Sequence, residues 1–169
     1  MNDVDTPLPA ALAEVEAWVA RRRAPTRHHV RALFIPLGEA LLEGRDEAEA
    51  FARVATWIGR DPEGWNEALK GELTMAATEH VRSADPRWIA NPKYDLAYAV
   101  EARHRLEARL TCAEHLGLEV ADDVLESIAR ADTVLAPQLD VLAPQLDVLA
   151  PSDLPAPDTD EATPPGRPE

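Results

Sequence analysis

Apolar residues recur through the first 135 positions at the three- and four-residue spacing of a helix face. The pattern predicts helices over about residues 7–24, 26–43, 46–58, 62–84, 92–116 and 121–136, with a short turn near Trp88 and Ile89. No stretch has the alternating apolar and polar pattern of a strand. We therefore predict an all-α fold, a compact bundle of six or seven helices.

Glycine and proline mark where these helices should begin and end. Gly44, Gly59 and Gly117 each follow a periodic segment, where the left-handed conformation of glycine would stop a helix. Asp61-Pro62 and Asn91-Pro92 are typical helix starts. Pro36 lies inside the second helical pattern and predicts a kink there.

The chain divides into three parts by composition. Residues 1–133 carry the helical patterns and form the predicted domain, and residues 134–151 contain a repeat. Residues 152–169 are rich in proline and acid and have little to bury, so we expect a disordered tail.

The repeat is the heptapeptide VLAPQLD, which occurs twice from Val134 and begins a third time before stopping at Pro151. A proline every seven residues is expected to prevent a continuous helix, so the sequence predicts an extended docking peptide. Duplication raises the effective concentration at a shell, ring or filament with repeated sites. Alternatives are a lengthened linker, or a strap folded back on the bundle.

The candidate partner-binding residues are the apolar positions of the repeat and one tryptophan that lies off the predicted apolar face of its helix. They are Val134, Leu135, Leu139, Val141, Leu142, Leu146, Val148, Leu149 and Trp57.

Charge limits the classes of partner. The formal net charge is −14, which opposes binding to nucleic acid and to anionic lipid. The N-terminal MNDVDTPLP has no basic leader before an apolar run, and no apolar stretch reaches the length of a membrane span. Cys112 is the only cysteine. We expect a cytoplasmic protein, and the Ala, Arg and Pro content is typical of a bacterial chain from a GC-rich genome.

Residues 52–71 resemble a helix-turn-helix, with Ala55 and Gly59 four positions apart and Asp61 as the cap of the second helix. The resemblance implies a DNA-reading helix that exposes Glu63, Asn66, Glu67 and Lys70. Two of these side chains are carboxylates, which DNA phosphates repel, so a DNA-binding regulator is the alternative rather than the leading hypothesis.

Glu101 and His104 have the E-x-x-H spacing found in di-iron bundles, but the sequence lacks the second E-x-x-H step, so these are weak metal candidates. Three further polar residues fall on or beside apolar faces: His80, Arg103 and Glu107. A buried arginine needs a partner, so we expect an Arg103–Glu107 pair or a bridge from Arg103 to another helix. The alternative is a polar pocket that holds an anionic ligand.

No nucleophile–base pair, phosphate loop, CxxC or HExxH motif is present in the sequence. We therefore expect a non-catalytic adaptor, cargo or assembly protein that binds a protein partner and needs no cofactor or metal. The sequence is also compatible with a homo-oligomer. A helical enzyme that holds a metal or small ligand is the second alternative.

Overall fold

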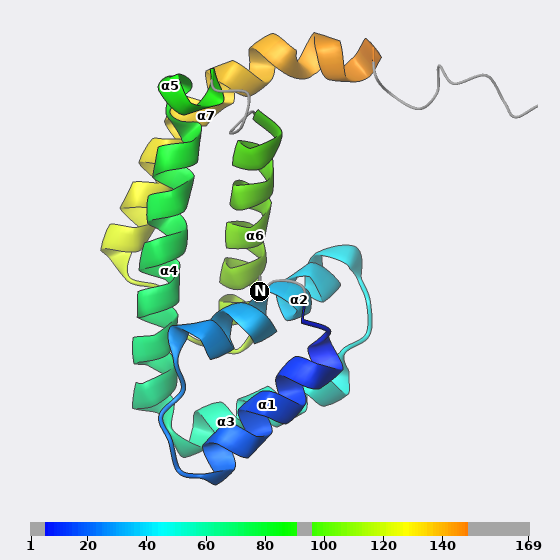
Figure 1. Cartoon of the computed structure of the whole chain (residues 1–169), viewed down its shortest axis with the longest axis vertical. Helices are drawn as coiled ribbons and strands as arrows, with labels where there is room; N and C mark the ends of the chain where they lie inside the picture. The colour runs from blue at the N-terminus through cyan, green and yellow to red at the C-terminus, as the bar shows by residue number, and fades with distance from the viewer. Residues whose placement is uncertain (1–5, 91–95, 149–169) are drawn as a thin grey trace, which may run out of the picture. The chain divides into compact units, whose positions relative to one another are not determined.

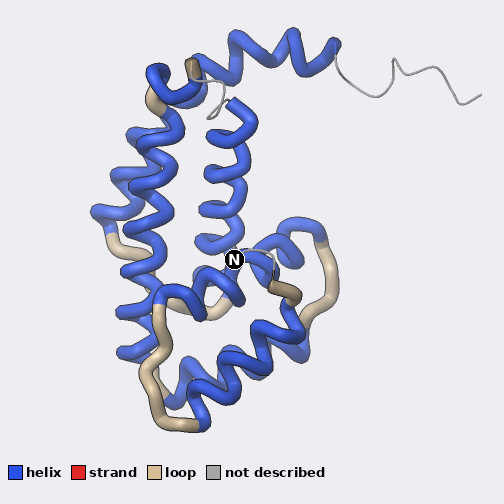
Figure 2. The backbone as a smooth tube through the Cα atoms, viewed as in Figure 1, coloured by secondary structure: helices blue, strands red, loops and turns tan. Residues whose placement is uncertain are grey.

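The computed structural model describes residues 6–90 and 96–148, and for residues 141–148 it describes the backbone. The helices are α1 (Leu8–Ala20), α2 (Arg27–Glu43), α3 (Ala48–Arg60), α4 (Pro62–Ala84), α5 (Pro86–Ile89), α6 (Leu96–His115) and α7 (Asp122–Val148). Within this part of the chain there are seven helices and no strand (Figure 2). The predicted all-α bundle of six or seven helices is confirmed.

The chain separates into a compact unit Met1–Leu135 and a second unit Ala136–Glu169, and α7 contributes to both. The predicted domain boundary lies two residues before this division. The predicted starting segment Asn91-Pro92, the last repeat residues 149–151 and the tail 152–169 lie outside the described residues.

Three helices form the centre of the first unit. In Figure 1, α4 and α6 lie side by side, and α2 packs against both. The largest fully buried side chains include Leu33, Phe34 and Leu37 of α2, Trp65 of α4 and Leu106 of α6. Helices α1 and α3 and the first half of α7 add residues to the same apolar cluster, so one core supports the unit.

Gly38 is the point of closest approach between α2 and α6. A Cβ atom at this position would lie 1.8 Å from the carbonyl oxygen of Ala108. No side chain fits there, because the neighbouring atoms belong to the main chain of α6 and cannot rotate away. Glycine at position 38 therefore sets the distance between these two helices.

Several helix ends follow the predicted signals. Gly44 ends α2 with φ +71°, and Gly117 follows α6 with φ +72°. At the start of α4, the Gly64 N–H donates to Asp61 Oδ1 at 3.0 Å. The prediction that Gly59 stops its helix is wrong. Gly59 lies inside α3, which continues to Arg60.

The expectation of an extended repeat is wrong for residues 134–148, which belong to α7. This helix has 27 residues and is longer than α6, which the sequence predicted to be the longest. Pro137 and Pro144 lack an N–H, so each removes one helical hydrogen bond at a cost of about 3 kcal/mol. The residues between them are mainly Leu, Gln and Ala, which favour helix, and a spacing of seven leaves almost two turns between prolines.

Two glycine substitutions test the packing of α2 against α6. Gly38→Ala should lower the free energy of unfolding by more than about 3 kcal/mol, because the new methyl group overlaps the main chain of α6. Gly59→Ala is the matched control, since Gly59 is exposed in α3 with open space around it. It should raise stability by about 0.5–1 kcal/mol.

Urea denaturation followed by circular dichroism measures both values. A Gly38→Ala protein as stable as the parent would contradict the close approach of the two helices.

Candidate functional site

The leucines of the repeat fall in one helical register. Leu135, Leu139, Leu142 and Leu146 are separated by four, three and four residues, a spacing that belongs to a single helix face. Pro137 and Pro144 fall on the opposite side of the same helical repeat. The prolines thus interrupt hydrogen bonds on the side away from the leucine positions.

The structure describes three of the proposed partner-binding side chains in this segment. Val134 is 46% exposed and Leu139 is partly buried. Leu135 is only 3% exposed, so the assignment of this residue to partner binding is corrected. For Val141, Leu142, Leu146 and Val148 the helical backbone is described, and Leu149 lies outside the described residues.

Trp57 is not an exposed contact residue, which corrects the prediction. It is 6% exposed and belongs to the apolar core. The buried residues of α3 are Ala50, Phe51, Val54 and Trp57. The sequence pattern predicted a buried face of Phe51, Val54, Ala55 and Ile58, of which Ala55 is exposed. The predicted face was rotated relative to the real one.

The four residues of the suggested DNA-reading helix, Glu63, Asn66, Glu67 and Lys70, are all exposed on α4. The connection between α3 and α4 consists of Asp61 alone. A helix-turn-helix joins its helices through three or four residues, so the resemblance does not extend to the turn.

The weak metal candidates have other partners. Glu101 Oε1 accepts a hydrogen bond from Arg105 at 2.6 Å, and His104 Nε2 lies 3.8 Å from Glu39 Oε1. In the portion of the chain that the structure describes, no group of three or more His, Cys, Asp or Glu residues could hold a metal ion.

His80 and Arg103 meet at Asp132 of α7, a residue that the sequence analysis missed. Arg103 Nε donates to Asp132 Oδ1 at 2.8 Å, and His80 Nε2 lies 2.7 Å from the same oxygen. Because a carboxylate only accepts, His80 Nε2 carries the proton. Glu107 is exposed, so the bridge from Arg103 to another helix is found rather than an Arg103–Glu107 pair.

The pKa of Asp132 follows from these contacts. Burial acts to raise this pKa, but the hydrogen bonds from Arg103 and His80 outweigh it and hold the pKa below its usual range. The contribution of Asp132 to stability is therefore present at neutral pH and is lost as the pH falls through the lowered pKa. The cluster joins α7 to α4 and α6.

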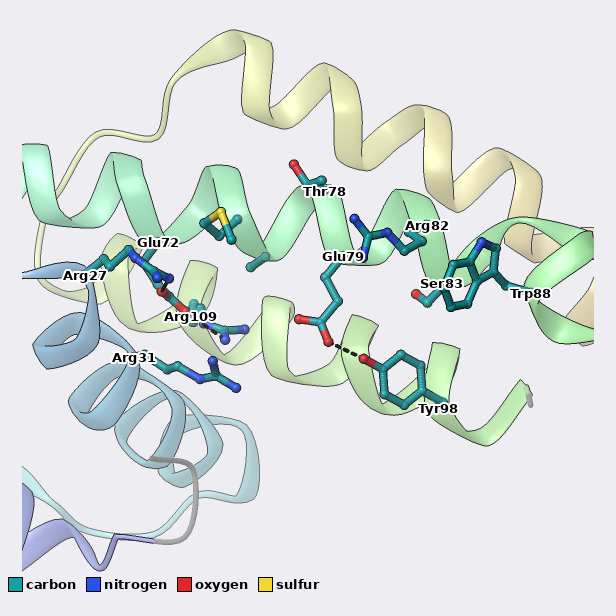
Figure 3. A pocket seen from close by; sticks show the side chains of 12 residues that line it. Arg27, Arg31, Glu72, Thr78, Glu79, Arg82, Ser83, Trp88, Tyr98 and Arg109 are labelled. Carbon is teal, nitrogen blue, oxygen red and sulfur yellow. Dashed lines mark hydrogen bonds and ion pairs between the residues drawn. The ribbon is translucent and has the colours of Figure 1, made fainter. Parts of the chain in front are cut away.

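Six charged side chains line a cavity of about 300 Å³ between α2, α4 and α6, and two of them are buried. We call it the arginine cavity, because Arg27, Arg31, Arg82 and Arg109 line it (Figure 3). Two glutamates, Glu72 and Glu79, share the lining, which leaves a formal excess of two positive charges. This excess is notable in a chain with a net charge of −14.

At the inner end of the arginine cavity, Glu72 and Arg109 form a buried ion pair. Arg109 Nη2 lies 2.9 Å from Glu72 Oε1, and the two side chains are 4% and 3% exposed. Arg27 Nη1 lies 4.0 Å from the other carboxylate oxygen. Figure 3 shows Arg27, Glu72 and Arg109 gathered together, with Arg31 beside them.

Burial dominates the electrostatics of this pair. It raises the pKa of Glu72, and the charges of Arg109, Arg31 and Arg27 oppose the increase. Burial also lowers the pKa of Arg109, which the charge of Glu72 opposes. Each charge therefore depends on the other to remain ionised in the interior.

The sequence contained a signal for this pair. Glu72 follows Leu69 by three residues and precedes Ala76 by four, on the apolar face of α4. Arg109 stands at the same offsets from Leu106 and Ala113 on α6. Arg103 was predicted to be the buried arginine of this helix, but its side chain is 30% exposed.

Comparison of the chain with protein-family models, with curated proteins and with solved structures finds no match. Among the helices of residues 6–90 and 96–148, none is both long enough and apolar enough to cross a membrane.

Alanine substitution of the helical prolines tests the form of the repeat. Because residues 134–148 are already helical, Pro137→Ala with Pro144→Ala should leave the helical circular dichroism signal close to that of the parent. The matched control is Gln138→Ala with Gln145→Ala, which changes helix propensity slightly and leaves both prolines in place. A clearly larger helical signal from the proline variant than from the control would show that the repeat is not helical in the parent chain, and would contradict a helix through the prolines.

Proposed function

We propose that this chain is a non-catalytic helical adaptor, cargo or assembly protein in the cytoplasm. It docks on a protein partner with several equivalent sites through the VLAPQLD repeat. The observation that carries this proposal is the register of Leu139, Leu142 and Leu146, which fall on one side of the helical backbone of α7.

A helix that presents apolar residues at spacings of three and four fits an apolar groove on a partner. Helices curve with their convex side toward solvent, and a kink at proline increases the bend. The prolines lie opposite the leucine register, so the bend would curve the leucine side around the partner. This mode of binding replaces the extended peptide that the sequence predicted.

Duplication supports a partner with repeated sites. The two copies are offset by seven residues, which corresponds to about 10 Å along a helix. When one copy is bound, the second is held near the next groove at high effective concentration. Each copy also carries one aspartate, Asp140 or Asp147, which favours a groove with a basic rim.

Paired substitutions in the full-length chain test this proposal. Leu139→Ser with Leu146→Ser removes one apolar position from each copy, while Asp140→Asn with Asp147→Asn changes the neighbouring positions without loss of volume. The tagged proteins are incubated in native lysate and cross-linked, and the cross-linked residues are mapped by mass spectrometry. The parent and the asparagine variant should cross-link to a common partner through residues 134–148. The variant with both leucines replaced by serine should capture at least about tenfold less of that partner.

Two results would refute docking through the repeat. One is equal capture by the leucine and asparagine variants. The other is that no partner cross-links to residues 134–148 of the parent chain.

A further inference from the structure

We propose that the arginine cavity binds a small phosphate monoester that carries an aromatic or apolar group. This site lies within the first unit and is independent of the docking function proposed for the repeat.

The lining has cationic groups that form no ion pair within the described part of the chain. Arg27 and Arg109 both approach Glu72, whereas Arg31 and Arg82 make no ion pair among residues 6–90 and 96–148. A phosphate monoester carries a charge of about −1.5 to −2 at neutral pH, which matches the excess of two positive charges in the lining. A single carboxylate would leave part of this excess without a counter-charge.

Two of the arginines that line the cavity also carry buried hydrogen-bond donors that lack acceptors. The Nε atoms of Arg31 and Arg109 are inaccessible to solvent and have no hydrogen-bond partner in the part of the chain described. A buried donor without an acceptor is costly, and an anionic oxygen is its strongest acceptor. Glu72 Oε2 is also without a hydrogen bond, but its negative charge is offset by Arg109 and Arg27.

The outer part of the cavity can hold an apolar substituent. Trp88 and Tyr98 line it, and Figure 3 shows both rings on the side of the cavity away from Arg109. The Tyr98 hydroxyl donates to Glu79 Oε1, which places a carboxylate of the lining near this end. The Arg82 guanidinium lies 5.8 Å from the Trp88 ring centre, between the two regions. The arrangement thus has one cationic end and one aromatic end.

The size of the cavity sets the size of the ligand. About 300 Å³ is at the lower end of the range for small-molecule sites, so the ligand has the dimensions of a phosphorylated ring. A nucleic-acid strand is too large for this space, and the net charge of −14 opposes any long polyanion.

Isothermal titration calorimetry on the full-length chain tests the proposal with four probes: phenyl phosphate, inorganic phosphate, benzoate and benzyl alcohol. Phenyl phosphate should bind with one-to-one stoichiometry, inorganic phosphate and benzoate at least about tenfold more weakly, and benzyl alcohol without measurable heat. Arg31→Gln and Arg82→Gln should each weaken the binding of phenyl phosphate about tenfold or more, because each removes a charged donor that forms no ion pair in the described part of the chain.

Arg45→Gln is the matched control, because Arg45 is exposed after α2, pairs with Glu43 and does not line the cavity. It should leave phenyl phosphate affinity unchanged. The Leu139→Ser with Leu146→Ser protein should also keep full affinity, which separates this site from the docking surface.

The proposal is overturned by the absence of saturable phenyl phosphate binding at millimolar concentration. Equal affinity for benzoate would overturn the phosphate assignment. Equal weakening by Arg45→Gln would show attraction to surface charge rather than binding in the cavity.

Discussion

The buried ion pair between Glu72 and Arg109 is the constraint on which the arrangement of α2, α4 and α6 depends. Two charges that are 3% and 4% exposed are tolerated in an apolar core only when they meet with good geometry. Their contact fixes the register of α4 against α6. A shift along either helix would leave both charges buried and unpaired, which costs more than an equivalent shift of apolar side chains.

Gly38 allows α2 to close over this pair. Gly38 contacts Ala108, which directly precedes Arg109 in the sequence. The close approach of α2 and the ion pair therefore occupy the same region of α6. Arg27 and Arg31 belong to the same helix as Gly38, and both reach the arginine cavity. The excess of positive charge there follows from the packing that brings α2 this close to α4 and α6.

Local signals in the sequence predicted most of the helix boundaries. Gly44, Gly117 and Asp61-Pro62 act within a few residues of their own position, so the tertiary fold does not change their meaning. The prediction for the repeat was wrong because the cost of proline in a helix is finite, and the leucine-rich residues between the prolines favour helix. The rule that proline ends a helix was therefore outweighed by the helix propensity of the neighbouring residues.

Predictions that required the orientation of a helix face were less accurate. Trp57 was expected at the surface and is in the core, because the face of α3 is turned relative to the one inferred from Ala55 and Ile58. A bridge from Arg103 to another helix was one of two alternatives that the sequence left open, and its partner Asp132 lies 29 residues away in the sequence. The spacing of Glu72 and of Arg109 places each on an apolar helix face, but it does not show that the two side chains meet, so the pair and the arginine cavity could not be predicted from the sequence.

A double-mutant cycle on Glu72→Met and Arg109→Met measures the central interaction most directly. Each single substitution should lower the free energy of unfolding by about 3–5 kcal/mol, and the double variant should lose at least about 2 kcal/mol less than the sum. The exposed pair Glu43–Arg45 serves as the reference cycle and should show a coupling below about 1 kcal/mol. Additive losses at Glu72 and Arg109 would contradict a buried ion pair that fixes α4 against α6.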